Sequence, residues 1–180
     1  MPDPIAFSGG PVGAWTVVRL TAVRGASLAP VARVDKGAHP VAGAVWSLSG
    51  VTSNLRYTNS TEKRVLDATP SILNRPEATR AALIPITKSA AWWSLAQDER
   101  RAIVEEKSRH IAIGAEYLAA VSRQLVHCRD QSGAVFDFLT WFEFAPADES
   151  RFDELLVKLR ASPEWQFVER EVDIRLEKAG

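Results

Sequence analysis

The sequence contains a single cysteine, Cys128, and this scarcity excludes several kinds of protein. One cysteine cannot form an internal disulfide, and it cannot supply the ligands of a Cys₄ or Cys₂His₂ zinc site. An excess of one charge is also missing, because 22 lysines and arginines balance 22 aspartates and glutamates. A chain without net charge has no general attraction for nucleic acid or anionic membranes, so we expect neither as a partner.

Long apolar runs are lacking as well. The longest uncharged stretch, residues 37–55, carries Pro40, Asn54 and several glycines and serines. Lipid would leave these polar groups poorly satisfied, so the stretch is not predicted to span a membrane. The only charged side chain before Arg19 is Asp3, which does not fit a secretory signal. We therefore expect a soluble, cytoplasmic protein, although a mature periplasmic form would show the same pattern.

Hydrophobic periodicity predicts a mixture of strands and helices. Alternating or continuous apolar residues predict strands at 15–23, 41–57 with a break near Gly50, 81–86, 123–128, 135–144 and 172–176. Helical spacing and capping residues predict helices from Ser60 or Thr61 to just before Pro70, over 95–120 and over 152–159, and a further helix start at Ser162-Pro163-Glu164. Residues 27–39 lack periodicity and are predicted to form a loop.

This order of elements predicts one α+β domain over residues 1–180. The pattern divides into two related halves, about 1–88 and 89–180, and we expect ferredoxin-like antiparallel sheets covered by helices on one side. The apolar stripe from Phe136 to Phe144 would then lie on the open face of a sheet. We expect a second copy of the chain to cover this face, which gives a homodimer.

Few residues are candidates for chemistry, since the sequence has no Gly-rich phosphate loop, nucleophile elbow or HExxH motif. His110 stands out because helical spacing places it on the same face as Ile103 and Ile111, where an unpaired imidazole is costly to bury. It is either a core histidine bonded to a backbone carbonyl or an axial metal or haem ligand. In the second case its other ring nitrogen needs an acceptor such as a carboxylate.

The tryptophans and Arg123 are less specific candidates for a site. Several tryptophans are either core residues or walls for a flat aromatic cofactor: Trp92, Trp93, Trp141 and Trp165. Arg123 heads an apolar strand, where an arginine often reaches out to water. His127 and Cys128 are neighbours on a strand and point to opposite faces, so they cannot readily bind one metal ion. We expect Cys128 to be a small buried residue rather than a nucleophile.

Several stretches of the sequence resemble the chlorite dismutase family, in particular its short, dimeric, bacterial lineage. They are 81–118 (AALIPITKSAAWWSLAQDERRAIVEEKSRHIAIGAEYL), 122–130 (SRQLVHCRD), 136–146 (FDFLTWFEFAP) and 162–176 (SPEWQFVEREVDIRL), with support from 14–26 and 50–58. The most specific part is the histidine of SRHIAIG, followed thirteen residues later by the arginine of SRQLVHCRD. The resemblance implies a dimeric α/β barrel type of fold with a haem-binding C-terminal half.

The resemblance also implies roles for individual residues. His110 matches the proximal haem ligand, and Glu164 best matches the carboxylate that accepts its other N–H, with Glu169 and Glu171 as alternatives. Residues that match the lining of the haem b site are Ile84, Lys88, Trp92, Trp93 and Leu118, with Lys88 suited to a haem propionate. Arg123 matches the distal arginine and is the implied catalytic residue. The glutamine that often bonds this arginine in the family is missing near Thr69.

The implied activity is that of a haem b-dependent enzyme that converts chlorite to chloride and O₂ and forms an O–O bond. Arg123 would hold the small oxyanion by charge-assisted hydrogen bonds in an otherwise apolar pocket. Two alternatives stay open. One is a coprohaem decarboxylase-like or peroxidase-like enzyme of the same superfamily, although that decarboxylase branch tends to be longer and usually lacks the arginine. The other is a non-enzymatic, dimeric ferredoxin-like binding protein, with or without haem.

Overall fold

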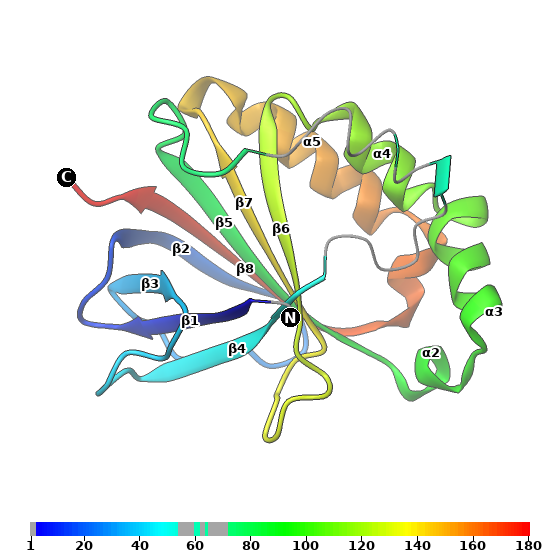
Figure 1. Ribbon diagram of the computed structural model, residues 1–180, viewed down its shortest axis with the longest axis horizontal. Helices are drawn as coiled ribbons and strands as arrows, with labels where there is room; N and C mark the ends of the chain where they lie inside the picture. Colours follow the sequence, from blue (N-terminus) through cyan, green and yellow to red (C-terminus); the bar gives the residue numbers. More distant parts are fainter. Residues whose placement is uncertain (1–2, 54–59, 62–63, 65–71) are drawn as a thin grey trace.

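The computed structural model describes residues 3–53, 60–61, 64 and 72–180 (Figure 1). The helix predicted between Ser60 and Pro70 lies largely outside these residues, although Ser60, Thr61 and Arg64 are helical. Thr69 lies outside them too. Within the described part of the chain, no helix is both long enough and apolar enough to cross a membrane.

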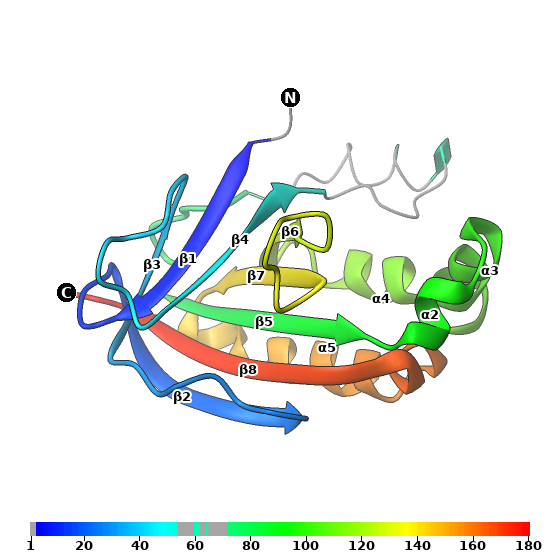
Figure 2. The same ribbon diagram turned by 90° about the horizontal axis from the view of Figure 1, so that it is seen from below.

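Eight antiparallel strands form a closed barrel in the order β1-β3-β2-β8-β5-β7-β6-β4 (Figures 1 and 2). The strands are β1 (Pro4–Gly10), β2 (Trp15–Arg24), β3 (Arg33–Gly37), β4 (Trp46–Thr52), β5 (Arg80–Lys88), β6 (Val121–His127), β7 (Phe138–Phe144) and β8 (Val168–Lys178). The predicted strands at 15–23, 81–86, 123–128 and 172–176 are confirmed. The prediction missed β1 and β3, and β4 runs through Gly50 without the predicted break.

The barrel interior is filled by one face of each strand, because successive side chains of a strand point to opposite faces. Large buried residues meet there, among them Phe7 of β1, Leu83 of β5 and Ile174 of β8. The Trp141 ring of β7 lies at the centre of this cluster, with the Phe7 ring centroid 5.5 Å away and the Trp15 centroid 5.2 Å away. These aromatic contacts add to the stability of the barrel core.

The predicted fold class of separate ferredoxin-like sheets is wrong. The two halves share one sheet, because β2 pairs with β8 from Trp15↔Lys178 to Arg24↔Glu171 and β4 pairs with β6 through Val51↔His127 and Thr52↔Val126. These pairings join strands that lie far apart in the sequence. Hydrophobic alternation reports which face of a strand is buried but not which strand lies beside it, and so it could not predict that the sheet closes.

The helices lie on the side of the barrel formed by β5, β7 and β6 (Figures 1 and 2). They are α2 (Ala90–Ser94), α3 (Gln97–Arg101), the π-helix η1 (Ala102–Lys107), α4 (His110–Glu116), the 3₁₀ turn η2 (Pro146–Asp148), α5 (Glu149–Arg160) and the 3₁₀ turn η3 (Pro163–Phe167). Of these, α4 and α5 lie along the three strands, and α2 and α3 lie beyond the end of β5 (Figures 1 and 2). The helix predicted over 152–159 is confirmed as α5. The predicted continuous helix over 95–120 is wrong, because the chain is divided there into α3, η1 and α4.

The phenylalanine stripe of β7 is covered by helices of its own chain. The Phe142 and Phe144 rings pack on Phe152 of α5, with centroids 4.9 and 4.7 Å apart, and Phe138 is also buried. The expectation that this stripe forms an open face is therefore wrong, and it gives no argument for a dimer. Instead, the stripe forms the floor of a pocket between the barrel and the helices.

Candidate active site

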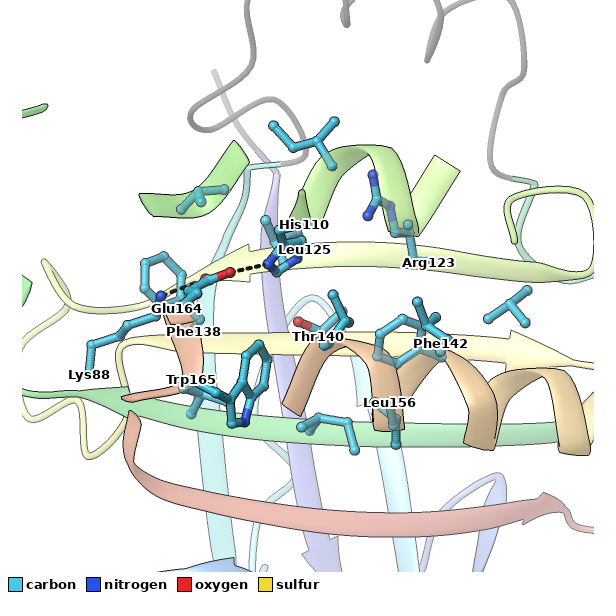
Figure 3. Close-up of a pocket in the computed structure, with 18 residues that line it drawn as sticks. Lys88, His110, Arg123, Leu125, Phe138, Thr140, Phe142, Leu156, Glu164 and Trp165 are labelled. Atoms are coloured by element: carbon cyan, nitrogen blue, oxygen red, sulfur yellow. Dashed lines mark hydrogen bonds and ion pairs between the residues drawn. The ribbon is translucent and has the colours of Figure 1, made fainter. Parts of the chain in front are cut away.

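A deep apolar pocket lies between the helices and the outer face of β5, β6 and β7 (Figure 3). The lining residues are Ile84, Ile86, Lys88, Val104, His110, Ile111, Gly114, Val121, Arg123, Leu125, Phe138, Thr140, Phe142, Leu155, Leu156, Leu159, Glu164 and Trp165. The wall is mainly aliphatic and aromatic, so its few polar groups define the chemistry.

His110 is the first residue of α4 and faces the pocket. Its Nδ1 lies 2.5 Å from Oε2 of Glu164, an interaction drawn as a dashed line in Figure 3. Because the carboxylate engages Nδ1, Nε2 is the ring nitrogen left for a ligand in the pocket. The side chain is 26% exposed, so it is not sealed in the core.

Glu164 is buried and is held from three sides. Besides His110, it accepts a hydrogen bond from Lys88 Nζ at 2.6 Å, and its backbone N–H donates to Ser108 Oγ at 2.8 Å. Burial alone would raise the pKa of Glu164, but the charges of and hydrogen bonds from His110 and Lys88 lower it to about 2. The carboxylate is therefore ionised at neutral pH and can accept the imidazole N–H.

Lys88, at the end of β5, contacts Glu164. The side chain is buried, and its ammonium group pairs with Glu164 and lies 3.7 Å from the centroid of the Trp92 ring. Its backbone N–H donates to Asp137 Oδ2 at 2.7 Å. The contact with a haem propionate stays a prediction, while the contact with Glu164 makes Lys88 part of the histidine–carboxylate unit.

Arg123 projects from β6 into the same pocket. Burial lowers its pKa, but the pKa of arginine is so high that the guanidinium stays charged at neutral pH. It packs against α4 at Gly114, where a Cβ would lie only 2.6 Å from Arg123 Nη1. The absence of a side chain at Gly114 thus leaves room for the only arginine among the described residues that line the pocket.

The structure brings together five of the site residues predicted from the sequence: Ile84, Lys88, His110, Arg123 and Glu164. Three others do not line the pocket: Trp92, Trp93 and Leu118. Trp92 is fully buried against Phe167, and Leu118 is buried as well. Trp93 stacks on Phe138 with ring centroids 5.9 Å apart and donates from Nε1 to Asp137 at 3.2 Å. Trp92 and Trp93 thus each contact a residue that lines the pocket, namely Lys88 and Phe138.

Sequence reasoning missed most of the apolar lining. Phe138, Thr140 and Phe142 were assigned to a dimer face, although their alternation on β7 was visible. Of the tryptophans with two interpretations, Trp165 does line the pocket, with its ring centroid 6.3 Å from that of His110. Trp141 belongs to the barrel core instead.

The structure confirms that Cys128 is buried. Its thiol donates to the carbonyl oxygen of Phe136 at 2.9 Å. Burial, assisted by the negative charge of Asp137, raises its pKa to about 12. A thiol with so high a pKa is not a nucleophile at neutral pH.

Fold and site together define a closed antiparallel barrel with a lateral pocket that holds one histidine–carboxylate pair and one buried arginine. The family model described as chlorite dismutase matches residues 34–177, which is most of the chain. The chain therefore belongs to the chlorite dismutase family.

Individual relatives agree with this assignment. The chain is 51% identical to the dimeric chlorite dismutase of Nitrobacter winogradskyi, whose crystal structure superposes with a TM-score of 0.91 and coverage of 97% of this chain and 99% of that one. A mutant chlorite dismutase of Candidatus Nitrospira defluvii is 26% identical, with a TM-score of 0.61 and coverage of 76% and 56%. The chlorite dismutase of Ideonella dechloratans is 31% identical over 120 residues, and the match spans 66% of this chain and 40% of that protein.

Proposed function

We propose that this protein is a haem b-dependent chlorite dismutase, which converts chlorite to chloride and O₂. The observation that carries the proposal is that His110, paired with Glu164, and the charged Arg123 line one apolar pocket. Family membership and the names of the relatives support the same activity.

The residues present fit a haem. A single imidazole with a carboxylate on its other nitrogen is the arrangement expected of an axial haem ligand, and apolar and aromatic walls suit a flat macrocycle. His110 Nε2 would hold the iron, with Ile84, Leu156 and Trp165 among the residues around the ring. When bound, the haem iron supplies a redox-active centre at which the Cl–O bond of chlorite can be cleaved.

The polar residues of the pocket then have distinct roles. Glu164 holds the proton at His110 Nδ1 and fixes the ring orientation, while Lys88 keeps Glu164 ionised and in place. Arg123 binds the chlorite anion and holds the oxygen-bearing fragment by charge-assisted hydrogen bonds. The conversion of ClO₂⁻ to Cl⁻ and O₂ needs no external electron or proton. Retention of the fragments in a dry pocket is therefore the main demand on the protein.

The test is to add chlorite to haem-loaded protein and record O₂ with an electrode. We expect O₂ release from the parent protein and little haem retention by His110→Ala. The matched control, His39→Ala, changes an exposed histidine and should retain haem. Haem loading without any O₂ release would contradict the activity and favour another enzyme of the superfamily.

Arg123→Ala should bind haem but release O₂ about 10²–10³ times more slowly, which is the usual cost of removing one donor that stabilises a developing oxyanion. Trappable hypochlorite should also leak from this variant. Arg19→Ala, which changes an exposed arginine, serves as the control. If Arg123→Ala keeps the parent rate without leakage, the proposed role of Arg123 is wrong.

We also propose that the protein is a homodimer. The support is the relative described as dimeric, which is 51% identical and covers nearly the whole chain. Light scattering at micromolar concentration should give twice the 19.8 kDa of one chain. A stable monomer would contradict this.

A further inference from the structure

The chain breaks its helix immediately before His110. Apolar spacing predicts one helix over 95–120, but η1 ends at Lys107 and α4 begins at His110. Between them, Arg109 adopts the left-handed backbone conformation with φ of 54° and ψ of 33°. A residue with a side chain adopts this conformation only at a cost in free energy, and strain of this kind is concentrated at functional sites.

The break creates a new helix N-terminus at His110, and Glu105 caps it. Arg109 occupies the N-cap position but makes no side-chain capping bond. Instead, Oε2 of Glu105 accepts the N–H of Ile111 at 2.9 Å and that of Ala112 at 3.4 Å. These second and third residues of α4 carry the N–H groups that an N-cap serine or aspartate normally satisfies. Glu105, from the preceding π-helix, therefore replaces the missing N-cap side chain.

The turn before α4 also contacts Glu164, the carboxylate that pairs with His110. Ser108 is buried, and its Oγ accepts the backbone N–H of Glu164 at 2.8 Å. His110, two residues later, meets the carboxylate of Glu164. The orientation of the first turn of α4 therefore decides whether His110 Nδ1 reaches Glu164.

We propose that Glu105 is a positioning residue for His110. By binding the amides of Ile111 and Ala112, its carboxylate fixes the first turn of α4. This keeps His110 Nδ1 on Glu164 and directs Nε2 into the pocket. The importance of this geometry for haem rests on the proposed function, but the geometry itself is a property of the chain alone and can be tested without haem.

The first measurement is amide hydrogen exchange at Ile111 and Ala112 by NMR on the full-length, haem-free protein. Glu105→Ala should accelerate exchange at both amides about five- to tenfold, as expected for loss of a helix cap. Glu105→Asp keeps the charge but withdraws the carboxylate by one methylene, so it should act in the same direction and serves if the alanine variant does not fold. Glu106→Ala is the matched control, since Glu106 is the exposed neighbour on the same π-helix.

The second measurement is the imidazole N–H proton signal of His110 in the same haem-free samples. A short hydrogen bond to Glu164 should give a downfield, slowly exchanging signal in the parent and in Glu106→Ala. The signal should be lost or broadened in Glu105→Ala and Glu105→Asp. A haem titration should then show about 10- to 100-fold weaker binding by these two variants, as is usual when a residue supporting a metal ligand is removed.

Unchanged amide exchange in the Glu105 variants would overturn the capping role. Faster exchange with an unchanged His110 signal would show that the cap serves only the helix and would overturn the positioning role. A parent protein that binds no haem would contradict the proposed function instead, and both NMR results would still decide the role of Glu105.

Discussion

Gly114 and Arg123 show how one missing side chain can shape the pocket. Gly114 lies one helical turn after His110, so both residues face the cavity from α4. Any Cβ at position 114 would come within 2.6 Å of the Arg123 guanidinium. That group is the flexible end of a side chain, so it would move rather than break the fold.

Gly114→Ala should therefore separate stability from activity. Alanine favours a helix over glycine by about 0.5–1 kcal/mol, so the free energy of unfolding in urea should stay equal or rise. Displacement of Arg123 should slow O₂ release about tenfold or more, because small misplacements of a positioned group are costly. In an Arg123→Ala background, Gly114→Ala should have no further effect on the rate. An effect of equal size in both backgrounds would refute this coupling.

The lowered pKa of Glu164 predicts that the free energy of unfolding depends on pH. Its pKa is about 2 in the folded protein and 4.5 ordinarily, so the folded state favours the ionised form. Its contribution to the free energy of unfolding is present above pH 4.5 and is lost as the pH falls toward 2. In urea titrations of haem-free protein, the parent should exceed Glu164→Gln in stability at neutral pH, and the difference should shrink below pH 4.5. A difference that stays constant with pH would contradict the assigned shift.

At the scale of elements, a buried ionic network fixes α5 and η3 to β8. Arg160, at the end of α5, donates from Nε and Nη2 to Glu171 Oε2 at 2.8 and 2.6 Å. Arg160 also contacts Asp173 at 3.1 Å. The other oxygen of Glu171 accepts the Trp165 indole N–H at 2.7 Å, and Trp165 lines the pocket next to Glu164. The network thus holds the wall of the pocket and not only the helix.

Removal of Arg160 should be strongly destabilising, because Glu171 is fully buried and would lose its cation. We expect Arg160→Met to lower the free energy of unfolding by about 3 kcal/mol, the lower end of the usual range for breaking a buried ion pair. Urea denaturation measures this. Arg151→Met on the same helix removes an exposed ion pair with Asp148 and should cost less than about 1 kcal/mol. Equal losses in the two variants would contradict the importance of the network.

At the scale of the whole molecule, the barrel closes where β4 meets β6. This seam consists of Val51↔His127 and Thr52↔Val126, extended by the Ser53 N–H, which donates to the carbonyl oxygen of Leu125 at 2.8 Å. Gly50 permits the close approach, since a Cβ there would lie 2.5 Å from the carbonyl oxygen of His127. Unlike the Arg123 side chain, this backbone atom cannot move without shifting β6, which carries Arg123 itself.

Gly50→Ala should loosen the seam and lower the free energy of unfolding by about 2–3 kcal/mol, as is typical of overpacking. Amide exchange should become faster in β4 and β6 before other strands. Gly10→Ala is the control, because the nearest atom to a Cβ at that buried strand position is 3.5 Å away. If both substitutions cost the same, the seam at Gly50 is not specially constrained.

The sequence by itself determined most local structure and the main polar residues of the site. Alternating or continuous apolar residues located β2, β5, β6 and β8, and helical spacing located α5. The resemblance singled out His110, Glu164 and Arg123, which the structure places in one pocket. The secondary-structure signals are readable because each is contained within about ten neighbouring residues.

Only the tertiary structure decided how these pieces combine. Barrel closure depends on pairings between β2 and β8 and between β4 and β6, for which no local pattern exists. The phenylalanines of β7 looked like an interface because the sequence does not show that α5 covers them. The break before His110 overrides a continuous helical pattern, since contacts of Glu105 and Ser108 stabilise a strained turn that helix propensity alone disfavours.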